Sequence, residues 1–386
     1  MKDLEEIREM KTYKHLFEKV VETENIKLAI WNASKGKRDR KDVAKILSDI
    51  ENQVKVIRQT LINDQYIPGC KKEETINEGS NKKARRIRKP DFEYDQIVHH
   101  AIIQILAPIF QKGMYEYVCG SVPKRGMHSG KRAIQRWIRN DTKNTKYCLK
   151  MDIRHFYQSV DTGILKEKLK RKIQDDRMLN LLFRVIDSCD TGLPLGYYTS
   201  QWFANFLLQE MDHYIKEQLY ATYYLRYMDD MVIFGSNKKK LHKMQIVIEK
   251  YLNVNLHLKM KQNWQVFRMK YTGKDLKEKG RALDFMGFYF FRCKTILRKS
   301  SMLAVVRKAR KIRKKQCPTW HDAASMLSHM GKFKHTDTRN VYERLIKPYA
   351  DIKKLKKLVS KHQRKVNQYA KSRIQKTSGL HARSTA

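Results

Sequence analysis

The sequence has no apolar run of about 18 residues, which is the length that a helix needs to cross a bilayer. Its N-terminal segment, MKDLEEIREM, lacks the apolar stretch of a secretory signal. Its six cysteines form no CxxC pair, so we expect reduced thiols and no zinc site. These absences argue against membrane-spanning and secreted classes and predict a cytoplasmic protein.

Acidic residues are scarce, with 40 Asp and Glu against 82 Lys and Arg, which gives a net charge of +42 and a pI of about 10.0. Repulsion on this scale destabilises a compact fold unless a polyanion neutralises it. Nucleic acid is the expected polyanion, because its phosphates bind Lys and Arg with release of counterions. An anionic membrane surface is the rival partner, and the absence of a spanning segment disfavours it.

The length of 386 residues predicts two or three domains, and the apolar share of 41% is enough for a sizeable core. Apolar residues at helical spacing predict helices throughout residues 1–65. A basic cluster and a buried helix over 97–110 follow within 66–145, and β-prone runs alternate with helices over 146–298. Basic helices predominate over 299–370, and residues 371–386 are predicted to be a disordered basic tail.

Three carboxylates stand out in the central region. Asp152 ends the strand-like run 147–153, and Asp229 and Asp230 lie at the tip of a predicted hairpin between two apolar runs. Adjacent acids repel each other, so a bound cation is the simplest reason to place them together. A solvated turn is the alternative for the hairpin tip alone. If the strand lies beside the hairpin, the three carboxylates converge on one face of a sheet.

Three such carboxylates suit phosphoryl transfer with a nucleotide substrate. Two Mg²⁺ ions about 4 Å apart activate a primer hydroxyl and stabilise the leaving pyrophosphate. Mg²⁺ takes few protein carboxylates and completes its shell with water and phosphate oxygens. We therefore expect two Mg²⁺ ions here, with Mn²⁺ able to substitute for them.

Four segments together resemble the bacterial reverse transcriptases, in the order that is typical of that family. They are motif A (149–161, LKMDIRHFYQSVD), motif B (191–208, TGLPLGYYTSQWFANFLL), motif C (227–230, YMDD) and motif E (283–288, LDFMGF). The resemblance implies an α/β (α+β) right-hand polymerase fold. Fingers would occupy 66–145, an antiparallel-sheet palm 146–298 and a helical thumb 299–370, after an N-terminal helical extension over 1–65.

The resemblance also implies the residues of the site. The expected catalytic residues are Asp152, Asp229 and Asp230, which would bind metal together with Ile153. The expected nucleotide-binding residues are Lys83, Arg85, Arg125, Tyr157, Leu195, Gly196, Gln201 and Lys259. The primer grip would be formed by Phe285, Met286 and Gly287. Tyr157 would exclude a ribose 2′-hydroxyl, although it could instead be a core aromatic. Lys261 qualifies as well as Lys259 for protonating pyrophosphate, and both remain open.

Motif B indicates a branch of the family. Its Leu195-Gly196 followed by Ser200-Gln201 is similar to diversity-generating retroelements, whose enzymes copy a template RNA with errors at adenines. Leu195 stands where relatives place a Gln, so discrimination between right and wrong base pairs should loosen, unless Leu195 serves only packing. Phage-defence and retron enzymes are the alternatives within the family. A non-catalytic RNA-binding protein and a maturase-like splicing factor are the alternatives of another class.

The implied partners are a structured template RNA, a primer, the RNA–DNA hybrid and dNTPs. The retroelement branch also implies a small helical accessory protein. No membrane partner is expected, and the resemblance implies a bacterial or phage-encoded protein of the cytoplasm. We find no second acidic cluster of the ribonuclease H kind in the sequence.

Overall fold

The structure is a computed structural model. It describes residues 12–78, 83–273, 275–333 and 335–384, and it gives residues 70–72, 77–78, 83, 85, 332 and 369–384 as backbone only. Within these ranges no helix combines the length and the apolar character that crossing a bilayer requires.

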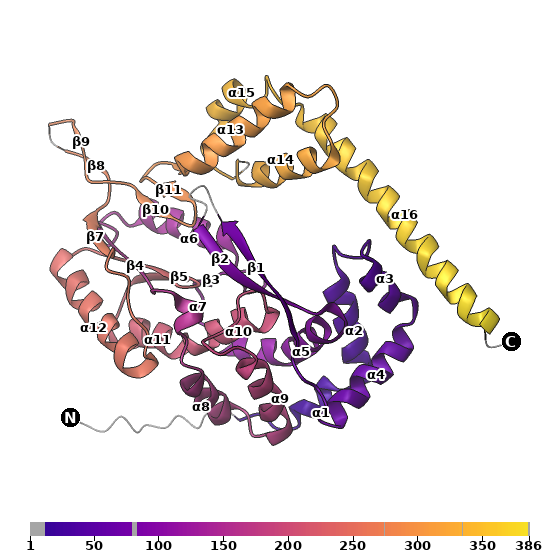
Figure 1. Cartoon of the computed structure of the whole chain (residues 1–386). Helices are drawn as coiled ribbons and strands as arrows, with labels where there is room; N and C mark the ends of the chain where they lie inside the picture. Colours follow the sequence, from indigo (N-terminus) through magenta and orange to yellow (C-terminus); the bar gives the residue numbers. More distant parts are fainter. Residues whose placement is uncertain (1–11, 79–82, 274, 334, 385–386) are drawn as a thin grey trace.

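The N-terminal part is helical, as its periodicity predicts. It contains α1 (Leu16–Val20), α2 (Thr23–Ser34), α3 (Lys41–Ser48) and α4 (Ile50–Ile62). The basic segment 36–41 separates α2 from α3, as expected. These helices lie against the long buried helix α5 (Ile97–Lys112), on which α2 packs directly (Figure 1).

Between the N-terminal helices and α5, the chain forms an antiparallel hairpin of β1 (Cys70–Glu78) and β2 (Lys83–Pro90), which is followed by η1 (Phe92–Gln96). After α5 come the short strand β3 (Val118–Cys119) and α6 (Met127–Asn140). The β1–β2 hairpin extends from the N-terminal helices toward the central sheet (Figure 1). Its basic residues therefore lie beside the central sheet.

The central sheet has the strand order β3-β5-β6-β4-β7. Its members besides β3 are β4 (Tyr147–Asp152), β5 (Tyr223–Tyr227), β6 (Asp230–Gly235) and β7 (Gln265–Arg268). The predicted hairpin is β5–β6, and β4 pairs antiparallel with β6. The strand that ends in Asp152 therefore lies beside the hairpin that carries Asp229 and Asp230, as the sequence predicted.

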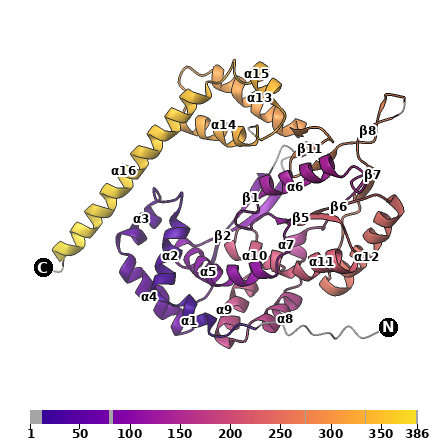
Figure 2. The same ribbon diagram turned by 180° about the vertical axis from the view of Figure 1, so that it is seen from behind.

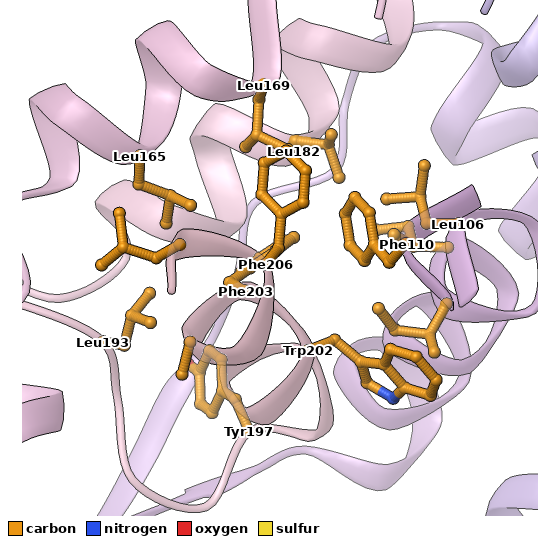
Figure 3. Close-up of a cluster of buried hydrophobic side chains, with 14 of the residues drawn as sticks. Leu106, Phe110, Leu165, Leu169, Leu182, Leu193, Tyr197, Trp202, Phe203 and Phe206 are labelled. Atoms are coloured by element: carbon orange, nitrogen blue, oxygen red, sulfur yellow. The ribbon is translucent and has the colours of Figure 1, made fainter. Parts of the chain in front are cut away.

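Helices cover one face of the sheet. They are α7 (Phe156–Ser159), α8 (Thr162–Lys172), α9 (Asp176–Asp187), α10 (Tyr198–Leu207), α11 (Gln209–His213), η2 (Tyr214–Gln218) and α12 (Lys238–Leu256). After Gly196 the chain forms α10, α11 and η2 in succession. Figure 3 shows the core where these helices meet α5, with Phe110, Phe203 and Phe206 in contact.

The opposite face of the sheet packs against a second, smaller sheet. Its strands are β10 (Leu283–Phe285), β11 (Phe288–Phe290) and β12 (Thr295–Leu297). Buried Phe285, Phe288 and Phe290 join Cys148 and Val232 of the central sheet in one apolar cluster. The ribbon β8 (Tyr271–Thr272) with β9 (Glu278–Lys279) precedes this sheet.

The C-terminal part is a group of helices, of which α16 reaches the N-terminal helices (Figure 2). It comprises α13 (Lys299–Arg313), α14 (Trp320–Phe333), α15 (Arg339–Leu345) and α16 (Ile352–Ser384). Helix α16 packs on α14 and then passes α3. Where we predicted a disordered tail from residue 371, the structure continues α16, in keeping with the high helix propensity of Lys, Arg, Gln and Ala.

Candidate active site

The register of the central sheet brings the three predicted carboxylates to the same end of two neighbouring strands, β4 and β6. Asp152 is the last residue of β4 and pairs directly with Asp230, the first residue of β6. Asp229 lies in the β5–β6 turn, where its carbonyl oxygen accepts a hydrogen bond from the Ile153 N–H at 3.3 Å. The turn depends on Met228, whose φ is 56°.

The carboxylates repel each other in this arrangement. Burial raises the pKa of Asp229 and of Asp230, and the negative charge of Asp152 raises both pKa values further. The pKa of Asp230 reaches about 6. A cation between these groups would relieve the repulsion.

Lys261 supplies a positive charge next to Asp152. Its ammonium group forms an ion pair with Asp152 Oδ2, and its backbone N–H donates to the Asp152 carbonyl oxygen at 2.9 Å. Lys259, the residue that we placed in the nucleotide set, is exposed on the same segment. The structure thus brings Lys261 to the carboxylates and leaves Lys259 outside them.

The donor set suits a hard divalent cation. In the described part of the chain, no three His, Cys, Asp or Glu side chains already stand together as a metal-binding group. However, Asp152 Oδ1 is buried without a hydrogen-bond partner, although a buried polar atom normally has one. Carboxylate oxygens are the ligands that Mg²⁺ prefers, so the residues present fit such an ion.

A pocket of about 450 Å³ opens beside the carboxylates. Its walls come from the β1–β2 hairpin, from α7, from the loop before α10 and from the turn between β5 and β6. The lining residues are Thr75, Ala84, Arg86, His155, Phe156, Tyr157, Gln158, Leu195, Asp229 and Lys261. This volume lies in the range of small-molecule sites and can hold a nucleotide.

Gly196 fixes the approach of this loop to the hairpin. The Leu195 carbonyl oxygen accepts a hydrogen bond from the Arg88 N–H at 2.8 Å. Gly196 has a φ of +111°, and a Cβ atom there would lie 2.2 Å from the Arg88 carbonyl oxygen. Only glycine fits this backbone contact. The close approach holds Leu195 in the pocket wall.

Four further residues were predicted to bind the nucleotide. The side chains of Lys83 and Arg85 fall outside the described residues, and Arg86 of the same strand lines the pocket. Arg125 donates to the Tyr115 carbonyl oxygen at 3.2 Å, and Gln201 is exposed on α10. Contacts of these residues with a nucleotide remain predictions.

The predicted primer grip forms the turn between β10 and β11. Phe285 is fully buried, whereas Met286 and Gly287 have φ values of 50° and 80°. The Gly287 carbonyl oxygen accepts a hydrogen bond from the Arg298 N–H at 2.9 Å, which ties the turn to the start of α13. The turn therefore has a defined shape, and its role toward a primer remains a prediction.

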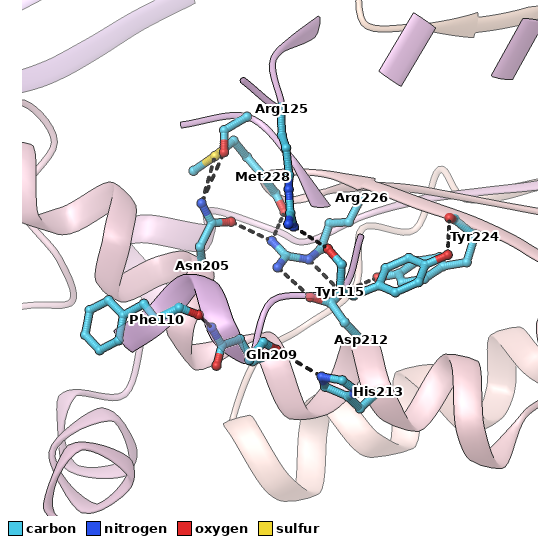
Figure 4. A network of polar contacts seen from close by, with 12 residues as sticks. Phe110, Tyr115, Arg125, Asn205, Gln209, Asp212, His213, Tyr224, Arg226 and Met228 are labelled. Carbon is cyan, nitrogen blue, oxygen red and sulfur yellow. Dashed lines mark hydrogen bonds and ion pairs between the residues drawn. The ribbon is translucent and has the colours of Figure 1, made fainter. Parts of the chain in front are cut away.

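The sequence reasoning missed a buried polar network beneath the acidic turn. Figure 4 shows Arg226 at its centre, between Asp212, Asn205 and Met228. One signal was available, because Arg226 interrupts the apolar strand YYLRY. A charged residue inside such a strand needs a buried partner, yet periodicity alone does not identify that partner.

The family model of the reverse transcriptases (RNA-dependent DNA polymerases) matches residues 70–290, which is more than half of the chain. The chain belongs to this family. The fold is accordingly the right-hand polymerase fold that we predicted, with mixed helices and strands. Polymerases of this family generally use divalent metal ions, in keeping with the donor set at the carboxylates.

Three bacterial proteins are similar to part of this chain. Protein YkfC of Escherichia coli K12 is 24% identical over 178 residues, covering 43% of this chain and 46% of that protein. The group II intron-encoded protein LtrA of Lactococcus lactis is 24% identical over 175 residues, covering 43% and 28%. The retron Ec73 reverse transcriptase of E. coli is 29% identical over 117 residues, covering 27% and 36%. The matched region thus spans less than half of each relative.

Among solved structures, telomerase of Candida albicans in complex with the TWJ fragment of telomeric RNA aligns with a TM-score of 0.46. The alignment covers 81% of this chain and 59% of that chain at 13% sequence identity.

Proposed function

We propose that this protein is an RNA-directed DNA polymerase that makes cDNA by metal-dependent nucleotidyl transfer. The observation that carries the proposal is the pairing of Asp152 with Asp230 in neighbouring strands, next to Asp229 in the turn that lines a pocket of nucleotide size. The family supports the same activity. The pocket lies against a basic hairpin, which suits a substrate that carries several negative charges.

Separate residues of the site would contact the metal ions, the sugar and the triphosphate. Asp152, Asp229 and Asp230, with Ile153 beside them, would hold two Mg²⁺ ions, for which Mn²⁺ can substitute. When bound, such ions polarise the phosphoryl oxygens and lower the pKa of the primer hydroxyl. Tyr157 would lie under the deoxyribose. Arg86 would meet the triphosphate, together with Lys83 and Arg85 of the same strand if their side chains reach it.

The template is proposed to be a structured RNA, and the product an RNA–DNA hybrid with its primer. The net charge of +42 supports a polyanionic partner of this size. We assign residues 66–145 to fingers, 146–298 to palm and 299–370 to thumb, and the last would follow the hybrid through phosphate contacts.

A primer-extension assay on an RNA template with dNTPs and Mg²⁺ tests the activity. We expect extension by the wild-type chain and loss of extension in Asp230→Asn, because the carboxylate charge is removed while the side-chain shape is kept. The matched control is Asp39→Asn, which changes an exposed aspartate in the N-terminal helical part. Equal extension by wild type and Asp230→Asn would refute the assignment. Absence of extension by a folded wild-type chain would favour the non-catalytic RNA-binding alternative.

Within the family, we propose the diversity-generating retroelement type. Support comes from Leu195-Gly196 with Ser200-Gln201 and from the place of Leu195 in the pocket wall. An apolar side chain there offers no hydrogen bond to the incoming nucleotide, so discrimination between base pairs is weaker. The retron or phage-defence type is the second candidate, because the retron Ec73 enzyme is 29% identical over 117 residues.

The fidelity of Leu195→Gln tests this assignment. We expect fewer misincorporations opposite template adenines than in wild type, measured by sequencing the cDNA made from a defined RNA. Leu195→Met is the control, because it keeps an apolar side chain of similar volume. An unchanged error spectrum in Leu195→Gln would contradict a role of Leu195 in fidelity.

The cellular partners follow from the same assignment. We propose a template RNA and a small helical accessory protein, and purification of the tagged chain from its host tests both. Sequencing the copurified RNA would show a template whose cDNA copies differ at adenines if the retroelement type holds. A single self-primed RNA species copied faithfully would favour the retron type.

A further inference from the structure

Arg226 and Asp212 form a fully buried ion pair under the acidic turn. The side chains of both residues are 0% exposed. Arg226 Nε donates to Asp212 Oδ1 at 2.8 Å, and Nη2 donates to Asp212 Oδ2 at 2.6 Å. The Tyr224 hydroxyl also donates to Asp212 Oδ1, at 2.6 Å. Burying such a pair costs free energy that its mutual attraction only partly offsets, so stability alone is a weak reason for it.

The remaining nitrogen of Arg226 reaches the turn itself. Nη1 donates to the Met228 carbonyl oxygen at 3.0 Å and to Asn205 Oδ1 at 2.9 Å. Asn205 in turn donates to the Gly120 carbonyl oxygen at 3.2 Å. One guanidinium thus joins helix α11, helix α10 and the turn that precedes Asp229 (Figure 4).

The turn is also held from its other side. Gly120 lies against Met228, so that a Cβ atom on Gly120 would come within 3.1 Å of Met228 Cγ. Met228 itself has a φ of 56°, a left-handed conformation that costs a non-glycine residue roughly 1 kcal/mol or more. Such a conformation persists when surrounding contacts determine it, and here they come from Arg226 and Gly120.

We propose that Arg226, Asp212 and Asn205 are positioning residues for metal binding. By fixing the Met228 carbonyl, they set the direction in which Asp229 and Asp230 leave the turn toward Asp152. The inference rests on the proposed function, because it assigns the metal affinity of the same carboxylates to this network. Arginine is required, because its planar guanidinium places three nitrogens on four acceptor oxygens of three residues at once, which the single ammonium of lysine cannot do.

Three sets of variants separate positioning from folding. Asn205→Ala removes the anchor of Arg226 to α10 and leaves the buried charges paired. Arg226→Lys keeps the charge and loses the fork. The combined change Arg226→Met, Asp212→Leu and Tyr224→Phe removes both charges and the hydroxyl, and such replacements of buried pairs are often neutral for stability.

The measurement is Mn²⁺ affinity, read from the electron paramagnetic resonance signal of free Mn²⁺. The full-length chain is titrated with Mn²⁺ in the presence of a dideoxy-terminated primer on an RNA template and a dNTP. We expect an affinity about tenfold weaker or more in each of the three variants, the range typical for residues that orient metal ligands. Thermal unfolding of each variant reports whether it is folded.

Lys168→Met is the matched control. Lys168 is buried and pairs with Glu210, which lies on α11 as Asp212 does, yet the pair does not touch the turn. This variant should lower stability and keep the Mn²⁺ affinity of wild type. Wild-type Mn²⁺ affinity in folded Asn205→Ala and in the combined variant would overturn the proposal.

A second baseline tests the underlying function separately. The variant Asp152→Asn with Asp230→Asn removes two of the three carboxylates and should lose this Mn²⁺ binding. If it binds Mn²⁺ as wild type does, the proposed metal site is wrong. If it loses binding while the network variants do not, only the positioning role fails.

Discussion

Tyr157 and Leu195 come from different segments and line one pocket next to Asp229. The Leu193 N–H donates to the Tyr157 carbonyl oxygen at 2.7 Å, which ties the two segments together through their backbones. At the scale of single residues, each side chain that lines the pocket can therefore be tested by its own substitution.

Tyr157→Ala should admit ribonucleotides. Tyr157 lines the pocket beside Asp229. In the proposed function its ring would occupy the space of a ribose 2′-hydroxyl, and alanine would leave that space open. We expect rNTP incorporation to rise by about tenfold or more relative to dNTP incorporation, in the range by which pocket contacts discriminate. Competition between rNTPs and dNTPs in primer extension measures it, with Tyr157→Phe as the control that keeps the ring. Unchanged selectivity in Tyr157→Ala would assign Tyr157 to the core.

Lys261→Arg should slow nucleotide incorporation more than Lys259→Arg does. Lys261 meets Asp152 in the pocket, whereas Lys259 is exposed. Arginine keeps the positive charge but does not give up a proton, so a general acid is lost while the ion pair is kept. We expect single-turnover rates about tenfold lower or more for Lys261→Arg. Equal effects of the two changes would argue against this role for Lys261.

His99 should make the fold sensitive to acid. Burial lowers the pKa of His99 to about 3 from its usual 6.5, and neither ring nitrogen has a hydrogen-bond partner. The unfolded chain takes up this proton below about pH 6.5, but the folded chain does not until near pH 3. The free energy of unfolding therefore falls as pH falls through this window, by about 1.4 kcal/mol per pH unit.

His99→Phe removes this proton uptake and keeps a ring against Tyr197, whose ring centroid lies 4.7 Å away. We expect the variant to lose less stability than wild type between pH 7 and about pH 4.5, as measured by urea unfolding. His15→Phe is the control, because the His15 side chain is 81% exposed. Parallel pH profiles for wild type and His99→Phe would contradict the prediction.

At the scale of elements, helix α10 connects the core to the site. It follows the loop that carries Leu195 and Gly196, it contributes Asn205 to the network around Arg226, and it packs on α5 and α8. Phe203 of α10 is fully buried and meets Phe110 of α5 edge-on, with ring centroids 6.5 Å apart. The packing of these rings therefore supports the position of the pocket wall.

Phe203→Ala should destabilise the protein by about 3–5 kcal/mol, because it removes buried apolar surface and leaves a cavity between two helices. Val254 lies on α12 and is 63% exposed. The control Val254→Ala should therefore change the free energy of unfolding by less than about 0.5 kcal/mol. Chemical denaturation of both variants measures the difference. A loss below about 1 kcal/mol for Phe203→Ala would mean that the core repacks around the gap.

At the scale of the whole molecule, positive charge dominates. The helices after Lys299 carry much of it, and α16 contains no acidic residue at all. The carboxyl groups that do occur are often paired, as in Lys315 with Asp322 and Arg298 with Asp284. The excess cations are therefore available to a polyanionic partner.

Affinity for an RNA–DNA hybrid should fall steeply with salt. Each phosphate contact releases counterions, so a chain with several contacts loses about 10³-fold in affinity or more between 50 and 200 mM salt. Fluorescence anisotropy with a labelled hybrid measures it, and thermal unfolding over the same salt range controls for the fold. A nearly flat salt dependence would show that few of these cations meet phosphate.

Local patterns in the sequence were enough to predict the individual helices and strands and to single out the acidic residues of the site. Apolar periodicity marked the helices around α5 and α12, and two apolar runs around Asp229 and Asp230 marked the hairpin. These features are readable because each depends on residues a few positions apart. The net charge likewise follows from composition alone and already pointed to nucleic acid.

Which of several nearby residues in a segment faces the site depends on the tertiary structure. The alternation of side chains along a strand means that a shift of one position reverses the face, and sequence does not fix that choice. The structure selects Arg86 as a pocket residue and Lys261 over Lys259. It also supplies the partners of Arg226, because contacts among separate elements depend on how helices pack against the sheet and not on any local pattern.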